Sequence, residues 1–224
     1  MFGLDLGDEG KKDYNEYFEM LHKFFFHLKK EQKLNFNFLL VKKEIDKRIF
    51  YFDAVRKATD KLDLILFDEN RKRSQQFFDD VKTYNLTQFD FMQIWGSLLI
   101  YKILIVYSNI ETLLLTMLKG VKYGDKQNEK IIGNEPLGIL LPKIFKLNKN
   151  KILNEDMMRN IIDIKFRNAL AHGWYRIENH QLIYFEESLE SEPKVMDEIE
   201  IVGRVIQLNI FGMALSHIVL EGDW

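Results

Sequence analysis

Arg167, Asn168 and His172 lie within one six-residue segment, and Gly173 follows directly. On a helix, Asn168 and His172 are four residues apart and share a face, and the long side chain of Arg167 reaches the same border. Gly173 is a natural helix stop and leaves His172 in the last turn, where the helix dipole favours positive charge. The segment therefore sets a fixed cation beside a group that titrates near neutral pH.

This combination suits cleavage of an RNA phosphodiester bond without a metal or any other cofactor. A base helps the ribose 2′-hydroxyl attack the phosphorus, while a cation offsets the charge that builds on the phosphate oxygens. Proton transfer by histidine is typically worth roughly 10²–10⁴ in rate, and a guanidinium binds two phosphate oxygens at once. We expect His172 to transfer the proton, Arg167 to hold the scissile phosphate and Asn168 to position one or both.

The same residues also have structural explanations. Asp163 precedes Arg167 by four residues and would pair with it on the helix surface, and His172 would end the helix by bonding a carbonyl. Ser108 and Glu111 share one face of an earlier, apolar helix. A glutamate there needs a partner, so Glu111 lies either at the rim beside a lysine or opposite Arg167, where it would orient the guanidinium.

The composition is that of one large helical domain, or of one domain with an extension. Of the 224 residues, 46% are hydrophobic and 29% are charged, which argues against global disorder. Three prolines and twelve glycines favour long helices over a many-stranded sandwich. The absence of cysteine excludes disulfides, thiolate metal sites and a cysteine nucleophile.

Charge and the first residues bear on partners and location. A net charge of −2 gives no general attraction to nucleic acid, so RNA binding requires a local basic patch. Lys143, Lys146 and Lys149 are the candidates, with a merely solvated face as the alternative. Residues 1–13 contain acids and no apolar run, unlike a secretory signal, and we expect a cytoplasmic protein without a membrane contact.

Apolar residues recur at three- and four-residue intervals along much of the chain, which predicts helices. The predicted helices cover residues 14–28, 35–52, 54–84, 89–118, 137–147, the stretch from an Asn154 cap into the motif, and 195–220. The stretch 89–118 is long enough to cross a membrane. Lys102, Asn109 and Glu111 interrupt it, which favours a core helix.

Two segments break the helical pattern. Residues 120–133 are polar and contain glycines at both ends, as expected of a loop. Residues 174–185 contain two short strand-like runs separated by a polar turn, which predicts a β-hairpin in which Asn179 suits positive φ.

At this point the chain resembles the HEPN superfamily, whose helical domains carry Arg, a polar residue, three further residues and His at the end of a late helix. Arg167, Asn168 and His172 match that pattern. Many members continue with a short hairpin and a closing helix, and place a polar or acidic residue on the long preceding helix, as Ser108 and Glu111 would be here. The resemblance covers about residues 87–221.

The resemblance implies an all-α helical bundle with a small β-hairpin before the last helix, formed by residues 87–224, with residues 1–86 as an N-terminal helical extension. It also implies a metal-independent endoribonuclease whose composite Arg/His site forms across a homodimer, often in toxin–antitoxin or phage-defence systems. Some relatives carry a nucleotide-modified tyrosine two residues after the histidine. Trp174 holds that position here, and Tyr175 comes one residue later.

Two other hypotheses remain open. A catalytically silent HEPN-like module would use the same pocket to bind a nucleotide, an RNA end or a partner protein, which agrees with the near-neutral net charge. Alternatively, residues 1–86 would form a regulatory or antitoxin-binding surface over a latent nuclease.

Overall fold

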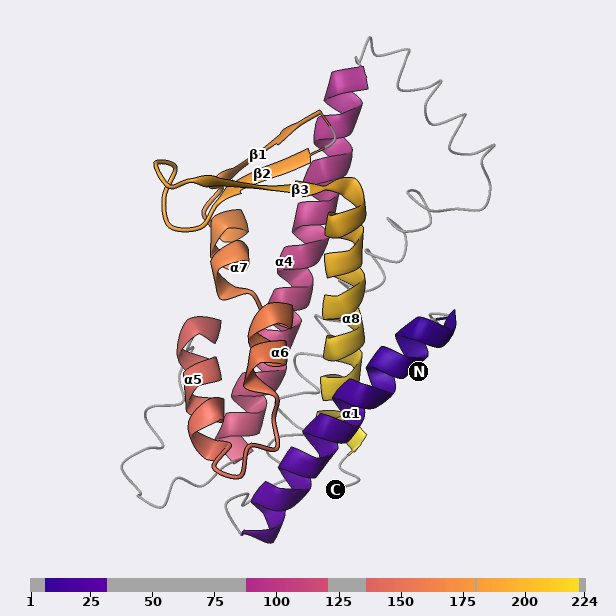
Figure 1. The fold of residues 1–224 in the computed structure, drawn as a ribbon, viewed down its shortest axis with the longest axis vertical. Coiled ribbons are helices and arrows are strands. Elements are labelled where there is room, and N and C mark those ends of the chain that lie inside the picture. The colour runs from indigo at the N-terminus through magenta and orange to yellow at the C-terminus, as the bar shows by residue number, and fades with distance from the viewer. Residues whose placement is uncertain (1–6, 32–87, 121–135, 180, 222–224) are drawn as a thin grey trace.

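The computed structural model describes residues 7–31, 88–120, 136–179 and 181–221. This part of the chain is mostly helical and carries one small antiparallel sheet (Figure 1). In chain order the helices are α1 (Gly7–Lys30), α4 (Gln88–Gly120), α5 (Leu137–Leu147), α6 (Glu155–Ile161), α7 (Ile164–Ala171) and α8 (Glu198–Glu221). The strands are β1 (Tyr175–Glu178), β2 (Gln181–Phe185) and β3 (Pro193–Asp197).

Most predicted elements that fall on described residues are confirmed. α1 and α4 contain the predicted helices 14–28 and 89–118, and α5 has the predicted bounds 137–147. The hairpin of β1 and β2 turns at Asn179, whose φ is +48°. The predicted helices 35–52 and 54–84, nearly all of the loop 120–133 and the domain boundary at residue 86 lie outside the described residues.

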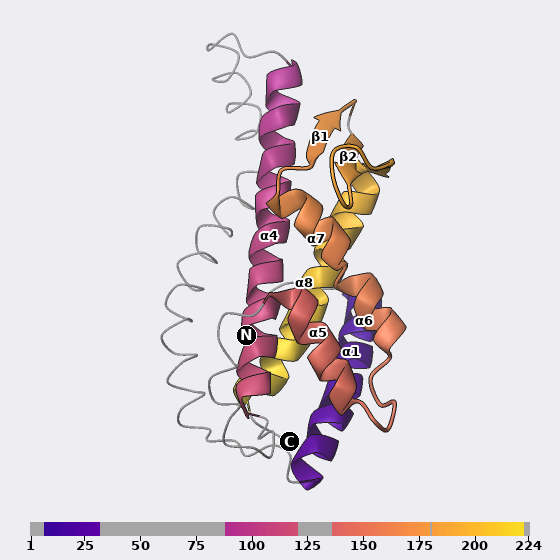
Figure 2. The same cartoon turned by 90° about the vertical axis from the view of Figure 1, so that its left-hand side faces the viewer.

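The core forms where α8 packs against α1 and α4. α4 runs beside α8, and α1 crosses the half of α8 that is farther from the sheet (Figures 1 and 2). Tyr17 of α1 meets Phe211 of α8 edge to face, with ring centroids 5.8 Å apart. Phe24 and Phe25 of α1 are buried in the same cluster as Ile110 of α4. α1 therefore belongs to the same hydrophobic core as the helices that follow.

The predicted hairpin is present, but the sheet has a third strand, so the prediction that the last helix begins at Val195 is wrong. β3 pairs with β2 in the order β1–β2–β3, with Val195 opposite Ile183. The last helix begins only at Glu198, because Asp197 and Glu200 form a capping box. The Asp197 carboxylate accepts from the Glu200 N–H and the Glu200 carboxylate accepts from the Asp197 N–H, both at 2.8 Å.

The helix predicted to run from Asn154 into the motif is two helices. Asn154 caps α6 as expected and accepts a 3.0 Å hydrogen bond from the Met157 N–H. The chain then leaves the helical conformation at Ile162, where ψ is 69°. Asp163 caps α7 by accepting from the Phe166 N–H at 3.0 Å. This second cap restarts the helix and sets the direction of α7 independently of α6.

Within the described residues one segment, Ile199–Val219 of α8, is long and apolar enough to cross a membrane by length and composition alone. This is weak evidence, because core helices of water-soluble proteins share both properties. Leu208 and Phe211 of this segment are fully buried. The predicted core role of residues 89–118 is confirmed by Ile103, Ile110 and Leu114 of α4, none of which is exposed.

Candidate active site

The first turn of α7 is anchored by residues from α4 and α8. The Tyr107 hydroxyl donates to the Asp163 backbone carbonyl at 3.2 Å. Arg204 lies 3.8 Å from the Asp163 carboxylate and its guanidinium stands 5.8 Å above the Phe166 ring. Burial raises the pKa of Tyr107 far above its usual range, which keeps the hydroxyl protonated as a donor. The helix that carries the motif thus starts from a fixed point.

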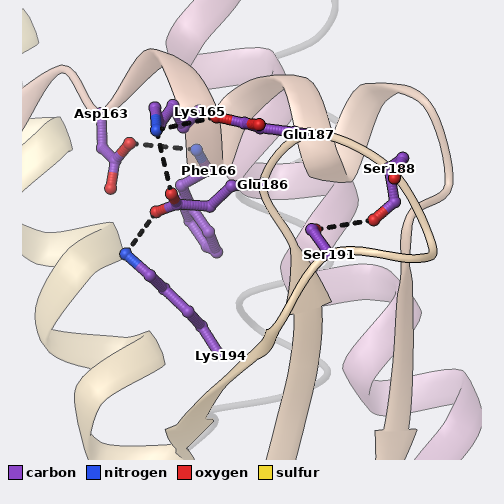
Figure 3. A network of polar contacts seen from close by, with 8 residues as sticks. All are labelled: Asp163, Lys165, Phe166, Glu186, Glu187, Ser188, Ser191 and Lys194. Atoms are coloured by element: carbon purple, nitrogen blue, oxygen red, sulfur yellow. Dashed lines mark hydrogen bonds and ion pairs between the residues drawn. The ribbon is translucent and has the colours of Figure 1, made fainter.

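A second set of contacts ties α7 to the loop between β2 and β3 (Figure 3). Lys165 pairs with both Glu186 and Glu187 at 3.3 Å, and Glu186 also binds Lys194 of β3. The hydrogen bond from Lys194, with help from Lys165, holds the pKa of Glu186 below its usual value. These charges connect α7 to the sheet on the protein surface.

Arg167 is held between α4 and its own helix. Its Nη2 lies 3.4 Å from Glu111 Oε2, and its Nη1 donates to Asn168 Oδ1 at 3.2 Å. Both charged side chains are half-buried, with 27% of Arg167 and 26% of Glu111 exposed. The predicted contact between Glu111 and Arg167 is present, whereas Asp163 caps α7 and pairs with Arg204 instead. Two of the five guanidinium donors are engaged in these contacts, which leaves others for a ligand.

His172 ends α7 as its C-cap, and its backbone N–H bonds Asn168 O at 2.9 Å. The next two residues form a Schellman motif. Gly173, at φ +70°, donates to Leu170 O at 3.3 Å, and Trp174 donates to Ala169 O at 2.8 Å. The His172 side chain is exposed and its ring stacks on Trp174, with centroids 4.8 Å apart and planes at 28°.

The structure brings together some of the predicted site residues. Arg167, Asn168 and Glu111 are in contact, and His172 follows on the same helix. Ser108 is exposed one turn before Glu111 on α4. Among the described residues no hydrogen bond or ring contact joins Arg167 to His172. The guanidinium pairs with Glu111 of α4, whereas the imidazole stacks on Trp174, which follows the end of α7.

The three candidate lysines are not part of this group. An added Cβ on Gly138, in the first turn of α5, would lie 3.8 Å from Ile164, the first residue of α7. α5 then runs away from the sheet, whereas α7 runs toward it (Figure 1). Lys146 and Lys149 are exposed and Lys143 is half-buried. These lysines lie in the C-terminal half of α5 or just after it, on the side away from His172. A phosphate backbone would meet these lysines at a distance from the motif.

Sequence reasoning missed two neighbours of the motif. Arg204, from a helix that follows the motif by some 30 residues, gave no signal of its own. Trp174 did give one, because an apolar residue directly after a helix-ending glycine is the usual partner of the preceding helix in a Schellman motif.

No protein-family model, curated protein or solved structure matches this chain. No group of three or more His, Asp or Glu residues suited to a metal ion occurs in the part of the chain that the structure describes.

Proposed function

We propose that this protein is a metal-independent endoribonuclease with a HEPN-like helical bundle, acting in the cytoplasm as a toxin or phage-defence effector. Arg167, Asn168 and His172 form its active site, and two protomers of a homodimer contribute to one composite site. The fold assignment, the RNA substrate and any antitoxin or regulatory partner rest on the resemblance of the motif and of the elements around it.

The observation that carries this proposal is a guanidinium held in place by Glu111 and Asn168, with an exposed histidine at the C-terminal end of the same short helix. Glu111 and Asn168 fix Arg167 from two sides, and the Schellman turn fixes the backbone of His172. A guanidinium that is already oriented stabilises developing phosphate charge without further reorganisation. An imidazole at an exposed position can take a proton from a substrate and return it.

In the proposed reaction the ribose 2′-oxygen attacks phosphorus while His172 removes its proton. The new O2′–P bond forms as the P–O5′ bond breaks, which gives a 2′,3′-cyclic phosphate and a 5′-hydroxyl. The leaving oxygen takes a proton from a protonated imidazole. One imidazole cannot take a proton from the 2′-hydroxyl and donate another to the leaving oxygen in the same step, so we assign the second imidazole to the partner subunit's His172.

The test is cleavage of RNA by the purified full chain in the presence of EDTA. We expect His172→Ala to lower the rate by about 10²–10⁴ and Arg167→Ala by about 10²–10³. Arg176→Ala is the matched control, because this arginine is exposed and pairs with Glu178 of its own strand. Wild-type protein that cleaves no RNA, or variants that cleave as well as wild type, would show the proposal to be wrong.

The second candidate function is a binding module without turnover. The ion pair with Glu111 favours it, because this pair neutralises part of the Arg167 charge before any ligand arrives. RNA binding that survives His172→Ala, together with the absence of cleavage products, would identify this function.

A further inference from the structure

Trp174 stacks on the His172 ring and is itself held by several contacts. Its backbone N–H is bonded to Ala169 of α7 and its carbonyl accepts from the Phe185 N–H of β2 at 2.9 Å. The side chain is half-buried and packs against the hydrophobic core. Trp174 is therefore fixed by the helix end, by the sheet and by the core at once.

The His172 ring lacks such support of its own. It belongs to an exposed residue at the end of the helix, and the contact found for the ring is the stack on Trp174 at 4.8 Å. An exposed side chain would otherwise exchange between rotamers. The stack on Trp174 covers one face of the His172 ring.

The glycine turn creates this arrangement. Gly173 takes φ +70°, a conformation that other residues adopt at a cost. The turn at Gly173 ends α7, and Trp174, directly after the turn, stacks on the His172 ring. The sequence His-Gly-Trp thus builds a support for the imidazole within three residues.

We propose that Trp174 is a positioning residue for His172, and that its indole face holds the imidazole in the orientation needed for proton transfer. This inference rests on the proposed function. Trp174 does not touch the reacting atoms. It restricts the imidazole, and a protonated imidazole over an indole face gains a cation–π interaction as well.

The experiment compares Trp174→Phe, which keeps an aromatic face, with Trp174→Leu and Trp174→Met, which keep apolar bulk without one. We expect both aliphatic variants to lower kcat about 10- to 100-fold with KM changed less than about threefold. Trp174→Phe should recover kcat to within about fivefold of wild type. Tyr175→Leu removes an aromatic ring one residue further along the chain, and it is the control for general disturbance of β1.

A second readout does not depend on cleavage. In NMR spectra of the full chain labelled at histidine, the indole ring current displaces the His172 ring signals, which His172→Ala assigns. The displacement should persist in part in Trp174→Phe and disappear in Trp174→Leu and Trp174→Met. Two aliphatic variants are included, so that if one of them fails to fold the test is made with the other.

The outcomes separate the two proposals. Wild type that cleaves no RNA overturns the proposed function, and the inference falls with it. If His172→Ala is inactive while a folded aliphatic variant keeps wild-type kcat and unchanged His172 signals, the inference alone is overturned. Loss of kcat together with loss of the ring-current displacement, both restored by Trp174→Phe, establishes it.

Discussion

At the scale of single residues, Glu111 has two opposing effects on Arg167. Its carboxylate lies 3.4 Å from the guanidinium and orients it, and the same negative charge weakens the attraction of the guanidinium for phosphate. A half-buried arginine without a partner would be free to adopt other rotamers. Orientation by hydrogen bonding and neutralisation by charge can be separated by substitution.

We expect Glu111→Ala to lower kcat/KM for RNA by about tenfold, because the guanidinium loses its fixed position. Glu111→Gln keeps an oxygen acceptor and removes the charge, so kcat/KM should stay within about threefold of wild type. Steady-state kinetics of RNA cleavage measure both effects. Equal losses in the two variants would contradict this account and would mean that the charge itself is required.

At the scale of elements, α7 depends on contacts to its neighbours for its position. It has eight residues, too few for an isolated helix to be stable in water. Stabilisation comes instead from its neighbours. The contacts are the Asp163 cap, those of Arg204 and Tyr107, and the surface ion pair with Glu186. Its attachment to the sheet is therefore expected to depend on pH through Glu186.

The pKa of Glu186 is lower in the folded protein than its ordinary value of 4.5, first because of the Lys194 hydrogen bond. The stabilisation is therefore complete above the pKa of the unfolded chain and is lost as the pH falls through the lower, folded value. We expect Glu186→Gln to lower the melting temperature by roughly 1–3 °C at pH 7. This difference should shrink as the pH falls below 4.5 and vanish once the pH is below the folded pKa of Glu186.

Thermal melts followed by circular dichroism across pH 3 to 7 measure this difference. Glu187→Gln is the matched control, since Glu187 is 74% exposed and pairs with Lys165, and it should change the melting temperature less. A difference that grows toward acid pH would contradict the assignment.

Local sequence encodes some of the boundaries of the helices and strands. The bounds of α5 follow from apolar spacing, and the Asn154 cap and the Asn179 turn follow from single residues with strong local preferences. The break at Ile162 was missed because apolar spacing continues across it. Asp163 was interpreted as an ion-pair partner of Arg167 rather than as a cap, although both interpretations agree with its position in the chain.

At the scale of the whole molecule, the proposed reaction needs two imidazoles, whereas the motif of one protomer carries one. Within that protomer Arg167 pairs with Glu111 and His172 stacks on Trp174, so we expect a second copy to contribute its own His172. α1 shares the core with α8, so removing residues 1–86 would expose Phe24 and Phe25 contacts rather than simply uncover a nuclease.

We expect the protein to behave in solution as a dimer with twice the 26.8 kDa mass of the chain, measured by light scattering after gel filtration. Refolding wild type with about a tenfold excess of His172→Ala should lower cleavage per wild-type chain about tenfold, because most wild-type protomers then lack the partner's His172 that the proposed reaction uses as its acid. A catalytically active monomer would contradict the composite site.

By itself the sequence determined what is local: the helical periods, the Asn154 cap, the Asn179 turn, and the spacing of Arg167, Asn168 and His172. Each depends on residues a few positions apart, where backbone preference and side-chain chemistry act directly. Only the tertiary structure decided that Arg167 pairs with Glu111, 56 residues away, that β3 joins the sheet, and that the lysines of α5 lie far from the motif. These choices depend on how separate elements pack, and packing selects among partners that local sequence leaves equivalent.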